Sequence, residues 1–150
     1  MDIEKNQARI AIRHDGEKLD LPVEGLGSEL KKRLDEIQTA MFEKAKVLRD
    51  DHIVQITEWK DFVPNLEKNN LVLAPWADPE DVEWEEWVKA TSREESLKNA
   101  GLEGEDERTA TSVAAKTLCV PFDQPELPEG TKCFASGKPA TCWVLWGRSY

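Results

Sequence analysis

The last twenty residues, TKCFASGKPATCWVLWGRSY (Thr131–Tyr150), decide the fold that the sequence predicts. They are typical of a β-hairpin, with a short strand at Thr131–Phe134, a turn at Ala135–Pro139 and a return strand at Ala140–Trp146. Gly137 supplies the positive φ that such a turn often needs. Because the return strand carries two tryptophans and is otherwise apolar, we expect other elements to cover it.

A parallel strand pair is predicted upstream of this hairpin. Ile53–Ile56 and Leu71–Ala74 are short apolar segments, and apolar residues recur at helical spacing over Thr57–Lys68 between them. Pro64 should kink this helix or end its first half. A strand, a helix and a second strand at this spacing predict a right-handed βαβ unit with parallel strands.

A further helix is predicted to begin at Asp78-Pro79-Glu80 and to run over Pro79–Thr91, with Trp84 and Trp87 on its inner face. Its acidic residues fit a solvated face better than a hard-metal site, because no other oxygen ligands converge on them. After about Leu97 the composition predicts a mobile acidic loop.

Val113–Phe122 is predicted to return to the sheet as a strand in which Leu118, Cys119 and Val120 are buried. The proline-containing segment Asp123–Gly130 then connects it to the final hairpin.

The N-terminal part predicts a separate hairpin and a long helix. Ala8–His14 alternates in polarity, Asp15-Gly16 is a tight-turn signal, and Glu17–Leu21 returns. A two-stranded hairpin alone is only marginally stable in water. We therefore expect this one to pair with strands from outside this chain or to pack on its own helix. Ser28 is expected to cap a helix that runs to about Arg49. Two interpretations of that helix's basic residues stay open, a tRNA contact and a solvated face with local ion pairs.

The elements together predict an α/β (α+β) fold, a small mixed sheet with a βαβ unit and a C-terminal hairpin, packed by three helices. The chain has 150 residues and a formal net charge of −10. An acidic surface repels phosphate groups, so we do not expect this chain to be a main nucleic-acid-binding surface. No apolar run is long enough to span a membrane, and residues 1–7 look like neither a signal nor a transit peptide. Three cysteines fit a reducing compartment, so we expect a cytoplasmic protein.

Four segments, in order, resemble a known family. The ending WGRSY, the segment Ala114–Phe122 (AAKTLCVPF) and the stretch Leu71–Trp87 are similar to the C-terminal domain of class II prolyl-tRNA synthetases of the archaeal and eukaryotic type. The segment Asp2–Pro22 resembles the closing strands of the anticodon-binding domain of the same enzymes. The resemblance implies two parts, residues 1–26 from the end of the anticodon-binding domain and residues 27–150 from the C-terminal domain.

The resemblance implies a structural domain of a proline–tRNA ligase, which braces the anticodon-binding and catalytic domains. Such an enzyme uses ATP and Mg²⁺ to charge tRNA(Pro) with proline, and the resemblance implies a homodimer for it. This chain shows no phosphate-binding glycine loop, nucleophile elbow or HExxH motif, so we expect the fragment itself to be non-catalytic. His14 and His52 are expected to be structural or merely exposed.

The resemblance also implies a four-cysteine zinc site, from which this sequence departs. Two family ligands follow the strand ending at Trp76, but residues 77–83 contain no cysteine here. Of the two ligands in the hairpin only Cys133 remains, beside Ala135 and Ser136. A structural zinc site needs four closed ligands, so we predict no zinc and a degenerate site held by apolar packing of tryptophans. A disulfide between Cys133 and Cys142 is the less favoured alternative.

The terminus Arg148-Ser149-Tyr150 is the candidate functional feature. One interpretation is that it docks on the catalytic domain and helps to order the active site. The other is that Tyr150 covers the hairpin of its own domain. Two other classes also stay open: a stand-alone protein-interaction module derived from this domain, and a metal-binding module. Complete burial of the clustered tryptophans would argue against an interface built on them.

Overall fold

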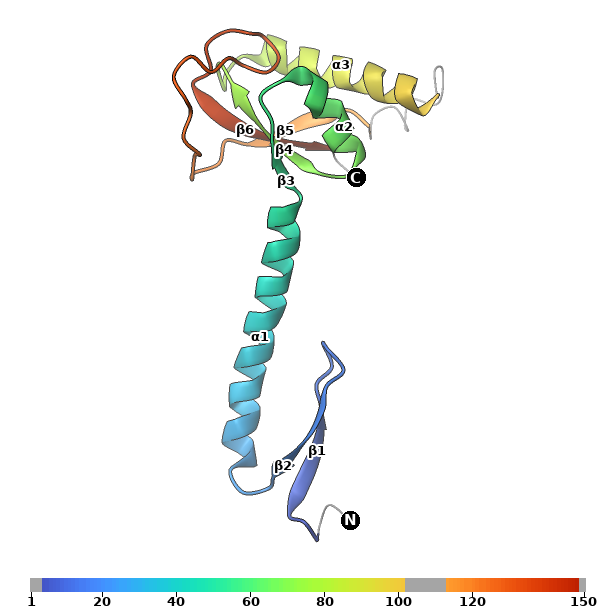
Figure 1. Cartoon of the computed structure of the whole chain (residues 1–150), viewed down its shortest axis with the longest axis vertical. Coiled ribbons are helices and arrows are strands. Elements are labelled where there is room, and N and C mark those ends of the chain that lie inside the picture. The colour runs from blue at the N-terminus through green and yellow to red at the C-terminus, as the bar shows by residue number, and fades with distance from the viewer. Residues whose placement is uncertain (1–3, 102–112, 149–150) are drawn as a thin grey trace. The chain divides into compact units, whose positions relative to one another are not determined.

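The computed structural model describes residues 4–101 and 113–148 (Figure 1). They form two compact units, Met1–Asp50 and Asp51–Tyr150, and each is described by itself below. The expected acidic loop falls mainly on residues 102–112, and Ser149 and Tyr150 follow the last described residue, so these lie outside the described residues. No helix in the described ranges has both the length and the apolar character to cross a lipid bilayer.

The first unit holds the predicted hairpin. Strands β1 (Gln7–Ala11) and β2 (Lys18–Pro22) pair antiparallel, which confirms the prediction from the alternating pattern. Gly16 adopts φ 81° in the turn, and its backbone N–H donates to the Ile12 carbonyl at 2.9 Å. A left-handed residue at this point favours glycine.

Helix α1 (Leu26–Asp51) follows the hairpin and is longer than predicted at both ends. The prediction that Ser28 caps it is wrong, because Ser28 lies inside the helix and its hydroxyl donates to the Gly25 carbonyl at 2.8 Å. None of its residues is buried, and Leu34, Met41 and Leu48 are exposed by more than half. The helix therefore leaves several large apolar side chains exposed.

The second unit is built on a four-stranded mixed sheet in the order β3-β4-β6-β5. Strand β3 (Ile53–Gln55) runs parallel to β4 (Leu71–Trp76), which confirms the predicted βαβ unit. Strand β6 (Cys142–Arg148) lies between β4 and β5 (Ala115–Cys119) and is antiparallel to both (Figure 1). The tryptophan-rich return strand is thus central, as its composition predicted.

The final hairpin is shorter than expected in its first arm. Lys132 and Pro139 form an isolated bridge, and Gly137 has φ 68° in the turn between them. The return strand β6 takes its sheet partners from β4 and β5 instead of from Thr131–Phe134. The pairing of apolar strands outweighs the local hairpin, because it buries more apolar surface.

The crossover helix is divided as Pro64 suggested. A 3-10 turn η1 (Trp59–Asp61) precedes α2 (Phe62–Glu67), and Pro64 lies in the first turn of α2. Proline is tolerated there because the N–H groups of a first helical turn have no partner within the helix.

Helix α3 (Val82–Ala100) starts later and ends later than predicted. Asp81 is its N-cap and accepts from the Trp84 backbone N–H at 3.2 Å, whereas Asp78 accepts from the Glu80 N–H in the preceding turn. The helix continues past Thr91 to Ala100 and closes on Gly101, which has φ 68°.

One face of the sheet packs against α2 and α3, and we call it the helix-covered face. It carries Val72, Ala74 and Trp76 of β4 and, in register, Val144 and Trp146 of β6. These side chains are 0–3% exposed and pack with Phe62, Leu66 and Val88 of the helices. Phe62 and Trp146 meet edge to face, with ring centroids 5.8 Å apart.

The other side of the sheet we call the opposite face, and it carries the alternate residues Leu71, Leu73, Trp143, Leu145 and Gly147. The connector between β5 and β6 contributes Gln124, whose side-chain oxygen accepts from the Trp143 N–H at 2.7 Å. The Gln124 amide nitrogen donates to the Trp143 carbonyl at 3.2 Å. This side chain therefore pairs with the backbone of β6 as a neighbouring strand would.

Strand β5 corrects one prediction. Leu118, Cys119 and Val120 were expected to be buried, but Leu118 is 48% exposed, Val120 is 43% exposed and Cys119 is exposed. The physical reason is that β5 is an edge strand, and its register with β6 shifts between Thr117 and Cys119. A bulge of this kind turns the strand away from the regular alternation of inner and outer positions.

Candidate functional site

The C-terminal end of β6 is the site that the sequence singled out. The Arg148 guanidinium donates through Nη2 to the Ser96 hydroxyl oxygen at 2.7 Å, and Ser96 is only 5% exposed on α3. Arg148 is thereby fixed against the last turns of that helix. Ser149 and Tyr150, the other two predicted site residues, lie outside the described residues.

A hollow of about 200 Å³ surrounds this contact, lined by residues of α2, α3 and β6 and by Val113. Asn99 donates from Nδ2 to Glu67 Oε1 at 2.9 Å on its rim. The hollow thus combines a fixed cation with a carboxylate that already accepts a hydrogen bond. The contact between Arg148 and Ser96 anchors the last residue of β6 to α3.

Residues 77–82 meet the 131–141 turn at the corner where the resemblance implies a metal site. Cys133 is 3% exposed, and its sulfur accepts from the Ser136 backbone N–H at 3.4 Å. The Thr141 hydroxyl donates to the Ala77 carbonyl at 2.8 Å. Among residues 4–101 and 113–148 there is no group of three or more His, Cys, Asp or Glu side chains that could hold a metal ion.

An ion pair crosses the same corner. Lys138 Nζ lies 3.3 Å from Asp81 Oδ2, and only 20% of the Asp81 side chain is exposed. The backbone N–H of Trp84 and then Lys138 hold the pKa of Asp81 below its ordinary value, and they outweigh the opposing effect of desolvation. One carboxylate therefore caps α3 and links it to the turn that carries Cys133.

Sequence reasoning missed this ion pair because its partners are 57 positions apart. The acidic residues of this helix, Asp81 among them, are predicted to form a solvated face, and Lys138 falls in the predicted turn Ala135–Pro139. The three cysteines are all thiols in the described structure, Cys119 exposed, Cys133 buried and Cys142 partly buried.

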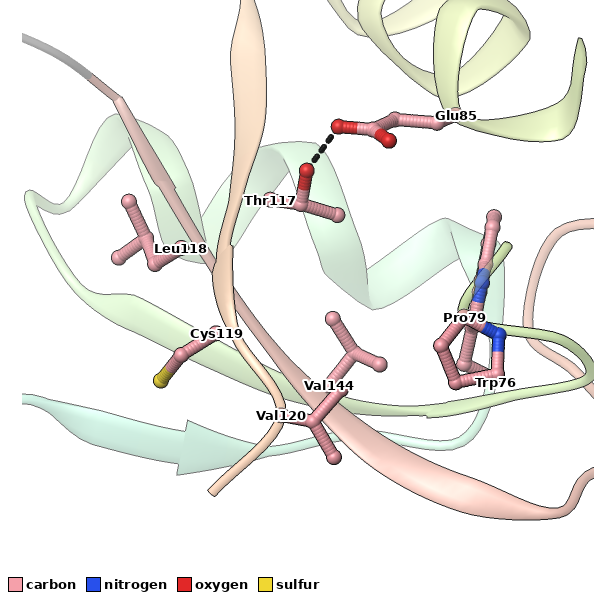
Figure 2. Close-up of a pocket in the computed structure, with 8 residues that line it drawn as sticks. All are labelled: Trp76, Pro79, Glu85, Thr117, Leu118, Cys119, Val120 and Val144. Carbon is pink, nitrogen blue, oxygen red and sulfur yellow. Dashed lines mark hydrogen bonds between the residues drawn. The ribbon is translucent and has the colours of Figure 1, made fainter. Parts of the chain in front are cut away.

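A second hollow, of about 140 Å³, opens between the start of α3 and the edge strand β5 (Figure 2). Thr117 donates its hydroxyl hydrogen to the Glu85 carboxylate across it, so both polar groups satisfy each other. The Cys119 side chain points away from that pair in Figure 2. The remaining walls are mainly apolar and come from Trp76, Pro79, Leu118, Val120 and Val144.

The tryptophans are buried to different degrees. Trp76, Trp143 and Trp146 are 0–3% exposed, while Trp84 is half-buried and Trp87 is 40% exposed. Trp59 donates from its indole nitrogen to Glu95 Oε1 at 2.8 Å and packs against Trp87 at 4.9 Å between centroids. The tryptophans of the sheet are therefore buried, whereas those of α3 are partly exposed to solvent.

The fold defines an α/β domain in which a four-stranded mixed sheet is covered on one face by α2 and α3, and an ion pair links the start of α3 to the turn before β6. Residues 59–150 match the family described as "Prolyl-tRNA synthetase, C-terminal", and the chain belongs to this family.

Proteins named as proline–tRNA ligases are similar to this chain over nearly its whole length. A cytoplasmic proline–tRNA ligase of Arabidopsis thaliana is 44% identical over 99% of this chain and 25% of its own length. A putative proline–tRNA ligase of Saccharomyces cerevisiae is 42% identical over 99% of the chain and 21% of its own length. A bifunctional glutamate/proline–tRNA ligase of Drosophila melanogaster is 33% identical over 97% of the chain and 8% of its own length. The chain thus spans a quarter or less of these three relatives.

Proposed function

We propose that this chain is the C-terminal structural part of a proline–tRNA ligase, which charges tRNA(Pro) with proline at the expense of ATP. The observation that supports this most is the 44% identity to a ligase of that name over 99% of the chain. In this proposal the ATP, Mg²⁺ and proline sites lie elsewhere in the polypeptide. Its compartment would be the cytoplasm, as the name of the Arabidopsis thaliana relative suggests.

Aminoacylation by the full-length protein tests the proposal directly. Purified full-length protein should attach labelled proline to tRNA(Pro) with ATP and Mg²⁺, and the isolated 150-residue chain should attach none. A full-length protein that charges a different amino acid, or none, would refute the proposal.

We also propose that residues 1–26 end the anticodon-binding domain and that residues 27–150 form the C-terminal domain. The support is an apolar groove in the first unit, about 310 Å³, between the hairpin and α1. It is lined by Ile10, Leu19, Leu21, Leu34 and Ile37. Preceding strands of the same polypeptide would cover this groove and complete the two-stranded sheet.

The role proposed for the second unit is to brace the catalytic domain through its terminus. Arg148 is the supporting residue, because its contact with buried Ser96 fixes the point at which the chain leaves β6. Deleting Ser149-Tyr150 from the full-length ligase should lower the rate of proline charging without shifting the unfolding midpoint of this unit. Unchanged charging would mean that Tyr150 serves only its own domain.

Zinc is proposed to be absent from this domain, and Lys138, Asp81 and the tryptophan packing to act in its place. Atomic emission on the dialysed protein tests this. One equivalent of zinc per chain would contradict it and point to ligands outside the described residues.

A second candidate function, a protein-interaction module, is favoured by one observation: Trp87 is 40% exposed beside half-buried Trp84. Complete burial of these side chains would have argued against an interface built on them. The two candidates separate in one experiment, since Trp87→Ala should leave proline charging unchanged if the residue serves only another partner.

A further inference from the structure

We propose that one exposed side of α3 is a docking surface for a basic segment of another protein, with a lysine or arginine of that segment stacked on Trp87. We call Glu83, Trp87, Ala90 and Glu94 the α3 stripe, and all four residues are exposed. The inference rests on the interaction-module candidate of the proposed function, and it deepens that candidate by naming the chemistry of the partner.

The α3 stripe follows one side of the helix. Its members are separated by four, three and four positions, which is the spacing of residues that share a helical face. Lys89 and Arg93 fall about 120° or more around the helix axis from Trp87, because successive residues are about 100° apart. Lys98 lies on the same side as the stripe, but one turn beyond its end.

The Trp87 ring is held in place from two sides although it is 40% exposed. Its centroid lies 4.9 Å from that of Trp59 and 5.2 Å from that of Trp84, and both neighbours pack against the hydrophobic core. Trp59 is fixed in turn by its hydrogen bond to Glu95. A ring that is already ordered loses little conformational entropy when a partner binds, and tryptophan is enriched among the residues that dominate binding energy.

The carboxylates of the stripe differ from the other carboxylates of α3. Glu86 pairs with Lys89 at 2.9 Å, Glu95 accepts from the Trp59 indole, and Glu85 accepts from the Thr117 hydroxyl. In the part of the chain that the structure describes, no ion pair involves Glu83 or Glu94.

Two carboxylates on either side of an exposed indole select a cation as the occupant. A lysine or arginine over the ring face gains a cation–π interaction, and neighbouring basic residues complement the two carboxylates. An RNA backbone would be repelled by the same carboxylates. A second copy of the chain is disfavoured, because each copy carries a net charge of −10.

The stripe also sets the spacing of the basic residues in the partner. Along the helix axis Glu83 lies about 6 Å before Trp87, and Glu94 lies about 10 Å beyond it. An extended peptide advances about 3.3 Å per residue. A segment with cations at positions i, i+2 and i+5 therefore matches Glu83, Trp87 and Glu94 in turn.

Fluorescence anisotropy with a labelled synthetic peptide, GKSRSSKG, tests the proposal at about 0.15 M salt. The peptide should bind both the 150-residue chain and the full-length protein. The variant Trp87→Leu should raise the dissociation constant about three- to fivefold, because it removes the ring face. The double variant Glu83→Gln/Glu94→Gln should raise it by a similar factor, and it leaves the aromatic packing of Trp87 intact.

The matched control is Glu126→Gln/Glu129→Gln, which removes the same charge from the connector between β5 and β6. Charges farther away than about 8 Å are largely screened at this salt concentration, so the dissociation constant should change by less than about 1.5-fold. An equal loss of affinity in the two double variants would overturn the proposal, since it would show attraction to acidic residues in general. Unchanged affinity in Glu83→Gln/Glu94→Gln would overturn it as well.

Two further results would assign the stripe to another occupant and overturn the proposal. One is binding of the peptide by the 150-residue chain but not by the full-length protein, which would mean that the same polypeptide covers the stripe. The other is binding of a labelled RNA oligonucleotide that Trp87→Leu weakens.

Aminoacylation separates a failure of this proposal from a failure of the proposed function. A full-length protein that charges proline but does not bind the peptide keeps the ligase function and loses only the docking surface. A full-length protein that binds the peptide but charges no proline refutes the ligase function and leaves the interaction module.

Discussion

The two faces of the β4–β6 sheet are built from the same strands but are covered differently. On the helix-covered face, Trp146, Phe62 and Val72 are fully buried among side chains of this chain. On the opposite face, Trp143 is 1% exposed, yet Leu118 of the edge strand β5, which lies close to Gly147, is 48% exposed. The difference teaches that the central strands bury their large side chains, while the edge strand leaves apolar side chains in contact with solvent.

The largest expected effect is on the helix-covered face. Trp146→Ala should lower the free energy of unfolding of the isolated chain by about 3–5 kcal/mol, because it removes a ring in contact with Phe62, Trp76 and Phe134. Urea unfolding followed by tryptophan fluorescence measures it. The control Phe122→Ala, at a fully exposed ring, should stay within about 0.5 kcal/mol of wild type. Similar losses of unfolding free energy for both variants would contradict the difference between the buried helix-covered face and the exposed edge of the sheet.

A smaller effect is expected at Gln124, whose side chain pairs with the Trp143 backbone as a neighbouring strand would. Gln124→Leu should cost about 1–3 kcal/mol, because it leaves the buried backbone N–H and carbonyl of Trp143 without these partners. Gln124→Glu keeps the acceptor for the Trp143 N–H and should recover part of the loss. Equal unfolding free energies for the two variants would show that the hydrogen bond to the N–H contributes nothing.

Gly147 tests how tightly the opposite face is packed near the edge strand β5. A Cβ there would lie 2.9 Å from Leu71 Cδ2 and 3.0 Å from Leu118 Cδ1, so both leucine side chains must shift. Gly147→Ala should cost about 1 kcal/mol, the lower end for overpacking, because those atoms end flexible side chains.

Leu118→Ala should relieve part of that cost in the double variant, because the contact with Leu71 remains, and the coupling between the two substitutions is the quantity to measure. Additive losses in urea unfolding would place Leu118 away from Gly147 in solution.

The sequence predicted the helix-covered face well, because strong local signals specify it. The continuous apolar runs of β4 and β6 predict central strands, and the spacing of Phe62, Val63 and Leu66 predicts a helix that packs on them. The exposure of Leu118 and Val120 was not predictable in the same way. It depends on β5 being an edge strand with a bulge, which is a property of strand order and not of local composition.

The candidate site was predicted only in outline for a similar reason. Arg148 was singled out from its place in a terminal motif, but its partner Ser96 lies 52 positions away on α3. The helix start was misplaced because Asp78 and Asp81 are both plausible caps, and only the chain's path around Pro79 selects Asp81. Long-range polar contacts leave no periodic pattern in a sequence, so propensity alone does not reveal them.

The smallest expected effect is a pH dependence from Asp81, which ties the helix-covered face to the degenerate corner. Because the folded-state pKa of Asp81 is lowered by the Trp84 N–H and Lys138, its contribution is fully present above the unfolded pKa, about 3.9. That contribution is lost as pH falls through the folded pKa.

The variant Asp81→Asn should therefore unfold at lower urea than wild type at pH 7, and the two midpoints should draw together as the pH falls below the unfolded pKa. Lys138→Met is the matched variant, since it removes the ammonium but keeps the cap on Trp84. It should reproduce only part of the difference at pH 7, because the backbone hydrogen bond is the larger cause of the lowered pKa. A gap between Asp81→Asn and wild type that stays constant down to pH 3 would mean that the charge of Asp81 contributes nothing to this corner.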